Sequence, residues 1–356
     1  MTSTSTKKSS DAMTKTSHIK RNPKKGYTLA FLFLLSLLGG LVLLNLVSGS
    51  VDLGLGDLYE VLFQGRALSR LEYNVLYKIR LPRIISAILF GMALSVSGFL
   101  LQTFFRNPIV GPSVLGITSG ARLFVGLIIL GNFGLGLQVQ SLGLFFVFSM
   151  VGSLLAMVLV LIFAKRSKSL STLVVIGIMI GYIATAITNF MMTFSDEHKI
   201  AGLTMWGLGS FSGVNWDMIR VSLIIIIPSI IMTFLSAKSL QAFLLGESYA
   251  MTMGLDIKKF RFRLIILSSC LTACVTAFAG PISFVGIAVP HISRILFKSA
   301  NPKILVPAIC LTGANFCLLS DYLARTLFAP IELNISVITS LIGAPIVIYL
   351  MTRRTR

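Results

Sequence analysis

The sequence predicts an all-α membrane protein with about ten transmembrane helices, on three observations. Of its 356 residues, 55% are hydrophobic and only 12% are charged, and the mean hydropathy is +0.89. Soluble domains carry about 25% charged residues. Apolar runs of roughly 20 residues, each able to cross about 30 Å of hydrocarbon, recur along the chain. Because the runs are continuous rather than alternating, they favour helices over a β-barrel.

The basic residues fit a membrane topology better than binding to nucleic acid. The net charge is +19, but the lysines and arginines cluster between the apolar runs. Cytoplasmic loops carry such clusters, which set the orientation of the spans. Residues 1–26 form a basic tail rich in Ser, Thr and Lys, which we expect to be disordered and cytoplasmic. Membrane lipid is expected around the rest of the chain, and no nucleic-acid partner is expected.

The apolar runs divide into about ten spans, and the positive-inside pattern places both termini in the cytoplasm. Six spans are expected first: 27–48, 83–104, a third that ends near residue 131, 141–164, 171–194 and 217–236. A long cytoplasmic segment, 238–263, follows them. Four more spans complete the chain: 264–280, an eighth that begins within 279–294, 303–320 and 333–351. Together they define one transmembrane domain over residues 27–353.

Two Gly/Pro-rich stretches interrupt apolar segments after the second and seventh spans. They read RNPIVGPSVLGITSGA (106–121) and AGPISFVGIAVPHISR (279–294). Because the two preceding spans cross in opposite directions, the pattern indicates an inverted repeat. Gly286 and Pro290 are expected to break or loosen the eighth span, which is tolerated where freed backbone groups face protein or a water-filled path. His291 falls at its cytoplasmic end, either as a packing or capping residue or in direct coupling.

The charged and reactive residues exclude several classes of function. None of the twelve acidic residues is expected in the middle of a span, so ion coupling through a carboxylate lacks a candidate. No GxxxxGK[ST] motif is present to cradle the phosphates of ATP. The three histidines have no metal-ligand spacing, and no nucleophile motif stands out. We therefore expect no catalytic residue, no metal site and no bound cofactor in this chain, which is not an enzyme.

Five stretches carry a resemblance to a known family. They are IRLPR (79–83), RNPIVGPSVLGITSGA (106–121), LLGESYAMTMGLD (244–256), AGPISFVGIAVPHISR (279–294) and LSDYLARTLFAPIELNISVITSLIGAPIVIYLM (319–351). In this order and spacing they resemble the permease family of iron-siderophore, haem and cobalamin ABC importers, over about residues 30–353. The resemblance implies the ten-helix fold of type II ABC importer permeases, in the bacterial cytoplasmic (inner) membrane.

The same resemblance implies partners. Such a permease forms a homodimer or pairs with a sister permease, and the translocation path lies between the two subunits. Two cytoplasmic ATPase subunits bind below and carry the ATP and magnesium that this chain lacks. An extracytoplasmic binding protein delivers the substrate.

Arginines at the outer ends of two spans match the family's docking positions for the binding protein. Arg80 and Arg83 flank Pro82 on one helical face, and Arg325 matches a third such position. In similar permeases these positions meet acidic residues of the binding protein. Because Asp321 lies four residues before Arg325, an internal ion pair is the alternative.

The cytoplasmic segment 238–263 matches the part of the family that contacts the ATPase. Glu247 is expected to open a short helix, where an acid suits the helix dipole, and Gly254 to close it. The resemblance assigns Gly246, Glu247, Ala250 and Gly254 to the ATPase contact. An ordinary interfacial helix is the alternative.

Three further residues are candidates for the gate or the path. Ser171 and Thr172 match a turn that forms part of the cytoplasmic gate in relatives, and they are also good N-cap residues. Arg122 lies well inside the predicted third span, where relatives commonly carry a small residue. A charge at that depth usually faces a path or a partner, here an anionic group of the substrate. The alternative is that Arg122 lies near a membrane interface.

The favoured function is a permease that translocates an iron chelate, a ferric siderophore or haem, with power from a separate ATPase. A cobalamin permease of the same family is the first alternative. An ion-coupled secondary transporter is disfavoured by the absent mid-span carboxylate. A structural or sensory membrane partner is disfavoured by the interrupted spans.

Overall fold

The computed structural model describes residues 23–49, 69–130, 142–166 and 170–353, with the single positions 54, 56 and 60. Residues 1–22 of the predicted disordered tail lie outside the described residues. Every regular element in the described ranges is helical, and no strand occurs there. The all-α prediction is therefore confirmed.

Ten helices correspond to the ten predicted spans. They are α1 (Pro23–Val47), α4 (Leu81–Phe105), α5 (Ile117–Ile129), α6 (Leu142–Arg166), α7 (Leu170–Thr193), α9 (Trp216–Leu235), α12 (Ile257–Ala279), α13 (Val285–Phe297), α14 (Pro302–Thr326) and α15 (Ile335–Arg353). Among the described residues, seven helices are long and apolar enough to cross a membrane, while α5, α13 and α15 provide shorter apolar helices. The predicted boundaries agree within a few residues, except at the seventh and ninth spans.

Six shorter elements connect or extend the spans. They are α3 (Arg70–Tyr73), the π-helix η1 (Asn74–Arg80), the 3₁₀ helix η2 (Pro112–Leu115), α8 (Glu197–Gly207), α10 (Ala237–Leu245) and α11 (Glu247–Thr252). The first two continue without a break into α4, so the helical run covers Arg70–Phe105. The helix α8 is absent from the sequence-based prediction, which places no element between the spans 171–194 and 217–236.

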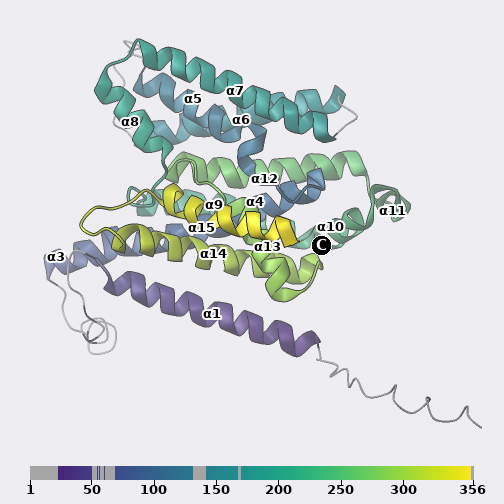
Figure 1. Cartoon of the computed structure of the whole chain (residues 1–356), viewed down its shortest axis with the longest axis horizontal. Coiled ribbons are helices and arrows are strands. Elements are labelled where there is room, and N and C mark those ends of the chain that lie inside the picture. The colour runs from purple at the N-terminus through teal and green to yellow at the C-terminus, as the bar shows by residue number, and fades with distance from the viewer. Residues whose placement is uncertain are drawn as a thin grey trace, which may run out of the picture.

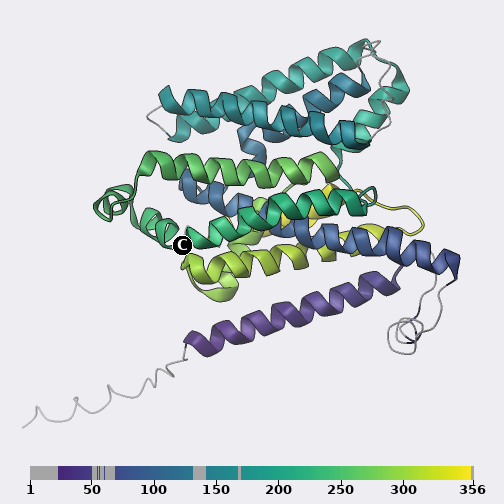
Figure 2. The same cartoon turned by 180° about the vertical axis from the view of Figure 1, so that it is seen from behind.

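The helices form layers around a central group (Figure 1). The elements α4, α9, α12, α13, α14 and α15 lie together in the middle, with α5, α6, α7 and α8 on one side and α1 on the other. The view from behind gives the same order (Figure 2). Close packing of α4 with both α12 and α14 holds the centre together, and α1 packs along α14.

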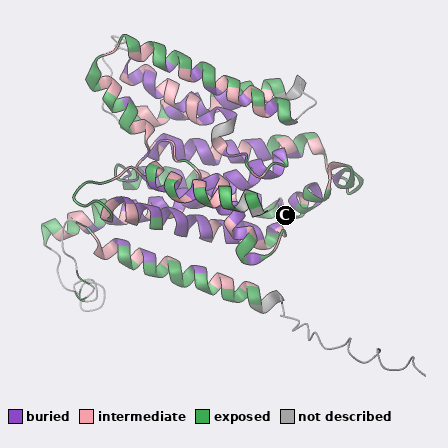
Figure 3. Ribbon diagram, viewed as in Figure 1, coloured by how far each residue is buried: buried purple, intermediate pink, exposed green. Residues whose placement is uncertain are grey.

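Burial separates the central helices from the peripheral ones (Figure 3). In the most apolar 18-residue window of each helix, 83% of the residues are buried in the run that ends in α4, and 72% in each of α12 and α14. For α1 the buried share is 17% and for α7 it is 28%. The core therefore lies along α4, α12 and α14, while α1 and α7 present apolar side chains to the surroundings.

Several helices begin at side chains that cap their first turn. The Asn215 side chain accepts a hydrogen bond from the backbone N–H of Met218, at the start of α9. The Asp256 side chain accepts a hydrogen bond from Lys259 N–H, 3.1 Å away, at the start of α12. This bond lowers the pKa of the Asp256 carboxyl. Such caps satisfy N–H groups that a helix leaves unpaired.

Candidate functional site

The two Gly/Pro-rich segments meet inside the bundle. Each follows a long helix, α4 of 25 residues and α12 of 23 residues, and each leads into a helix of 13 residues, α5 or α13. Arg106, just after α4, and Arg261, near the start of α12, pair with the same carboxylate, that of Glu247. The end of α4 therefore lies beside the start of α12, and the two long helices are antiparallel. This arrangement agrees with the predicted inverted repeat.

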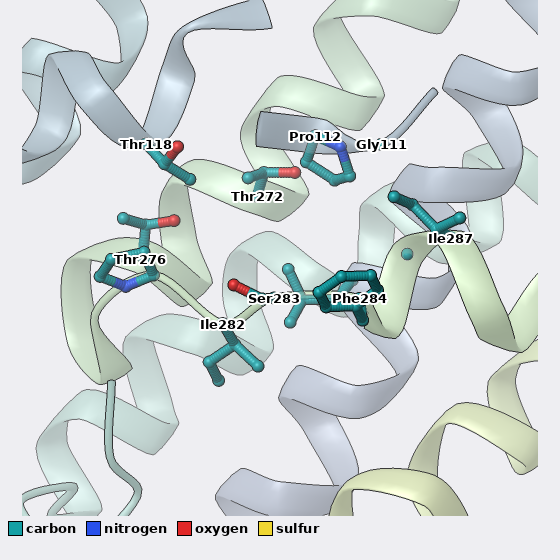
Figure 4. Close-up of a pocket in the computed structure, with 12 residues that line it drawn as sticks. Gly111, Pro112, Thr118, Thr272, Thr276, Ile282, Ser283, Phe284 and Ile287 are labelled. Carbon is teal, nitrogen blue, oxygen red and sulfur yellow. The ribbon is translucent and has the colours of Figure 1, made fainter. Parts of the chain in front are cut away.

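A cavity of about 170 Å³ lies where the two segments meet (Figure 4). Its polar lining includes the hydroxyls of Thr118, Thr272 and Thr276. The Thr272 hydroxyl is 2.7 Å from that of Ser97 on α4. The other lining residues are Leu94, Gly111, Pro112, Pro281, Ile282, Ser283, Phe284, Gly286 and Ile287. Irregular backbone at this depth therefore faces protein and a partly polar cavity rather than lipid.

Glycines allow α4 and α13 to cross at close range. A Cβ added to Gly98 would lie 1.8 Å from the carbonyl oxygen of Gly286. A Cβ on Gly286 would lie 2.9 Å from Cδ of Pro112. Both distances are far below van der Waals contact, so only glycine fits at this crossing.

Of the two outcomes expected at Gly286 and Pro290, a break or a loosening of the eighth span, the structure shows no break. The helix α13 runs through both residues, and the interruption lies just before it, at 280–284. Pro290 has no N–H, so the carbonyl of Gly286 loses its usual helical donor. The side chain of Gln102 on α4 supplies that donor, with Nε2 3.3 Å from the Gly286 oxygen. A tertiary contact thus keeps the helix continuous.

Arg83 lies in a buried ion-pair network at the N-terminal end of α4. Its Nε is 3.0 Å from Oδ1 of Asp321 on α14, and its Nη1 is 3.0 Å from Oε2 of Glu332. The side chain of Asp321 is 1% exposed and that of Arg83 is 8% exposed. Arg83 therefore engages two carboxylates of its own chain.

Arg80 and Arg325 engage the end of α1. Arg80 donates to the carbonyls of Leu46 and Val47, and Arg325 donates to the carbonyl of Ser48, at 3.2 Å. These carbonyls lie at the helix C-terminus, where no intrahelical N–H reaches them and a cation suits the dipole. Arg325 also lies 3.4 Å from the Asp321 carboxylate, which is the internal pair that the sequence left open.

The predicted coupling segment folds into two short helices, α10 and α11, at one end of the bundle (Figure 1). Gly246 joins them at φ +136°, and Gly254 follows α11 at φ +81°, so both positions favour glycine. Glu247 opens α11 and Gly254 ends it, as predicted. Ala250 is buried within the chain, and its contact with an ATPase stays a prediction, as do those of Gly246, Glu247 and Gly254. In α11 and the residue after it, the exposed side chains are Ser248, Tyr249, Met251, Thr252 and Met253.

Glu247 makes two ion pairs within the chain. Its Oε1 lies 3.6 Å from Nη2 of Arg106, just after α4, and 2.5 Å from Nη2 of Arg261 on α12. Arg106 has φ +49° and ψ +30°, in the left-handed region that favours glycine. Such a conformation costs about 1 kcal/mol or more in a residue with a Cβ, which the contacts of the arginine side chain offset.

His291 takes the packing role that the sequence left open. It lies buried on α13, with Nε2 3.1 Å from the carbonyl oxygen of Pro108. The contact ties α13 to the segment that follows α4. Within the described ranges, no group of three or more His, Cys, Asp or Glu residues is placed to hold a metal ion.

Comparison with known protein families establishes the class of this protein. A family model of the FecCD transport family matches residues 34–353 of the chain. The chain belongs to the FecCD transport family. The match spans all ten predicted transmembrane helices, most of α1 included.

Relatives of this FecCD family member are permeases of importers. It is 33% identical to the hemin transport system permease protein HmuU of Yersinia pestis, over 88% of this chain and 94% of that protein. It is 34% identical to the vitamin B12 import system permease protein BtuC of Vibrio vulnificus, over 86% and 91% respectively. A solved metal-chelate type ABC transporter in an inward-facing conformation has a TM-score of 0.80 and 30% identity, covering 92% of this chain and 99% of that one.

This FecCD family member is therefore the transmembrane permease subunit of an ABC importer, and it is a transport subunit rather than an enzyme. It is a multi-pass protein of the bacterial cytoplasmic membrane, and its family works with an ATPase and a binding protein. The type II permease fold is confirmed. The alternatives of a secondary transporter and of a structural or sensory partner do not hold for a FecCD permease.

The remaining candidate residues of this FecCD permease stay predictions. Ser171 and Thr172 are exposed within the first turn of α7, where the described helix already begins at Leu170. Arg122 is half-buried on α5, with Cζ 3.8 Å from the position of a Cβ on Gly207 of α8. Docking by Arg80, Arg83 and Arg325 is also untested, and the structure shows their internal contacts. The sequence does not predict the ion pairs of Glu247 or the hydrogen bond that Gln102 donates to Gly286, because no local sequence pattern indicates either contact.

Proposed function

We propose that this permease imports an iron chelate, a ferric siderophore or haem, across the bacterial cytoplasmic membrane. The observation that carries the proposal is Arg122, whose buried Nε has no hydrogen-bond partner among the described residues. A guanidinium inside a span is expensive unless it faces a path or a partner. It pairs well with carboxylates, such as a haem propionate or a siderophore carboxylate. The relatives named for hemin and metal-chelate transport support the same class.

Cobalamin is the second candidate substrate. The identity to the vitamin B12 permease of Vibrio vulnificus is 34%, beside 33% to the hemin permease. Overall similarity therefore favours neither class. Arg122 favours chelates that carry carboxylates, because a planar guanidinium pairs with a planar carboxylate through two parallel hydrogen bonds.

The working assembly in this proposal contains two copies of the permease, two ATPase subunits that bind ATP and magnesium, and one extracytoplasmic binding protein. The path runs between the two permease copies. ATP binding and hydrolysis shift the assembly between outward-open and inward-open states. Both termini lie in the cytoplasm, which agrees with the basic residues at the ends of α4, α6 and α13, namely Arg106, Arg166 and Lys298.

Reconstitution of the complete complex in liposomes tests the substrate class. Uptake of ferric siderophore, haem and cobalamin is measured with wild type, Arg122→Gln and Arg122→Lys. Loss of a charge-assisted hydrogen bond lowers uptake of the anionic chelate about tenfold in Arg122→Gln, with partial recovery in Arg122→Lys. Arg220→Gln, at an exposed site on α9, is the control and leaves uptake unchanged. Preferred uptake of cobalamin, or full chelate uptake in Arg122→Gln, overturns the proposal.

A further inference from the structure

Arg106, the residue that follows α4, has a backbone conformation that favours glycine over residues with a side chain. Arg106 is in the left-handed conformation, where glycine is the usual residue at a helix end. Its guanidinium lies over the ring of Phe243 on α10, 5.4 Å from the ring centroid. It also pairs with Glu247 on α11. Two separate contacts thus join the end of α4 to the coupling helices.

Glu247, the first residue of α11, pairs with arginines at the end of α4 and on α12. One carboxylate oxygen faces the arginines of both α4 and α12, namely Arg106 and Arg261. The two guanidiniums would repel each other without this carboxylate. The rings of Phe243 and Phe260 pack beside the cluster, with centroids 5.5 Å apart. Glu247 therefore fixes the position of α11 relative to both long helices of the inverted repeat.

The segment after Arg106 extends these contacts to the interior of the membrane domain. The carbonyl of Pro108 lies 3.1 Å from His291 on α13. A Cβ on Gly111 would lie 2.8 Å from Cγ1 of Ile287, so this part also packs tightly on α13. The chain then enters η2 and α5. A displacement of α11 thus reaches both 13-residue helices through one short segment, residues 106–111.

We propose that Glu247 is a positioning residue that transmits motion of the coupling helix α11, through Arg106 and residues 106–111, to α13 and α5. This inference rests on the proposed assembly with an ATPase, which would displace α11. The role differs from a direct contact of Glu247 with the ATPase, because the carboxylate acts within its own chain. Packed elements with two discrete arrangements carry such coupling.

Three variants test the role in the reconstituted complex. Arg106→Gly removes the side chain and relaxes the backbone, so the variant folds without the strain of the arginine. Glu247→Gln keeps the size of the side chain and removes the charge. Lys259→Gln is the matched control, because the Lys259–Asp256 pair lies at the same end of the bundle with side chains 86% and 51% exposed. Ligand uptake per ATP hydrolysed falls about tenfold in the first two variants and not in the third.

A second readout needs no transported ligand. Spin labels at Leu296 on α13 and Val175 on α7, both exposed, report a distance within one chain. The four native cysteines are first replaced by alanine. In the complex with its ATPase, adding nucleotide shifts this distance in wild type and in Lys259→Gln, and the shift is lost in Arg106→Gly and Glu247→Gln.

The two readouts distinguish failure of this inference from failure of the proposed substrate class. A nucleotide-driven shift that persists in Arg106→Gly and Glu247→Gln overturns the inference. Absence of chelate uptake in wild type, with the shift present and lost in the two variants, counts against the substrate class and supports the inference.

Discussion

Buried charges at single residues define the end of the bundle where α4 begins and α14 ends. Asp321 is a carboxylate within α14, and it faces guanidiniums from α4 and from its own helix. Taking such charges out of water is tolerated only when they remain paired. The arginine positions that resemble a docking surface are thus also structural, since they hold α1, α4 and α14 together.

Removing the charge of Asp321 should destabilise the protein strongly. In Asp321→Asn, Arg83 and Arg325 lose a buried partner, and we expect the free energy of unfolding to fall by about 3 kcal/mol. Thermal unfolding in detergent measures the change.

Asp217→Asn provides the control at the residue scale. Asp217 and Arg220 form a pair whose side chains are 84% and 75% exposed. Loss of an exposed pair changes stability by less than about 1 kcal/mol. Equal effects in the two variants would show that the buried network contributes no more than a surface pair.

At the scale of elements, hydrophobicity alone does not reveal where a helix lies. The helices α1 and α4 are both strongly apolar, yet 17% of one and 83% of the other is buried in their most apolar windows. Gly91 and Gly98 let α4 approach the backbone of neighbouring helices, whereas Gly39 and Gly40 of α1 face nothing within 4 Å. The site of each approach depends on which helix lies opposite, which sequence periodicity does not show.

The crossing of α4 and α13 gives a sharp prediction. Gly98→Ala would place a Cβ against the backbone of Gly286, which has no side chain to move aside. We expect a loss of stability of more than about 2 kcal/mol, measured as thermal unfolding and as the yield of folded protein.

Gly202→Ala is the matched control at this scale. Gly202 is exposed on α8 and a Cβ there meets nothing within 4 Å. Because alanine is the better helix former, the change should stabilise the protein by up to about 1 kcal/mol. If Gly98→Ala behaved in the same way, the close approach of α4 and α13 would not be required.

At the scale of the whole molecule, the exposed apolar face of α7 is the main question. Its exposed apolar side chains include Tyr182 and Ile183, which are 65% and 61% exposed. The predicted gate residues, Ser171 and Thr172, lie in its first turn. A path between two copies would therefore run along α7.

Cross-linking tests this arrangement. In a background without native cysteines, Tyr182→Cys should cross-link two copies of the chain in the membrane, with at least a severalfold higher yield than Leu32→Cys. Leu32 is 57% exposed on α1, on the opposite side of the bundle, and serves as the control (Figure 1). Equal yields from both positions would contradict a homodimer built on α7.

The sequence by itself determined the class of fold, the ten spans and the family. These follow from continuous apolar runs, from basic residues between them and from local motifs, all of which are properties of neighbouring residues. It also placed the ends of α11 at Glu247 and Gly254, because caps are local.

Only the tertiary structure decided what the key side chains touch. Glu247 and Arg106 are more than a hundred residues apart in sequence, as are Arg83 and Asp321, and Gln102 and Gly286. The helix α13 continues through Pro290 for the same reason, since the donor that replaces the missing N–H comes from another helix. Long-range pairing depends on how helices cross, and a sequence of uniformly apolar helices does not specify that crossing residue by residue.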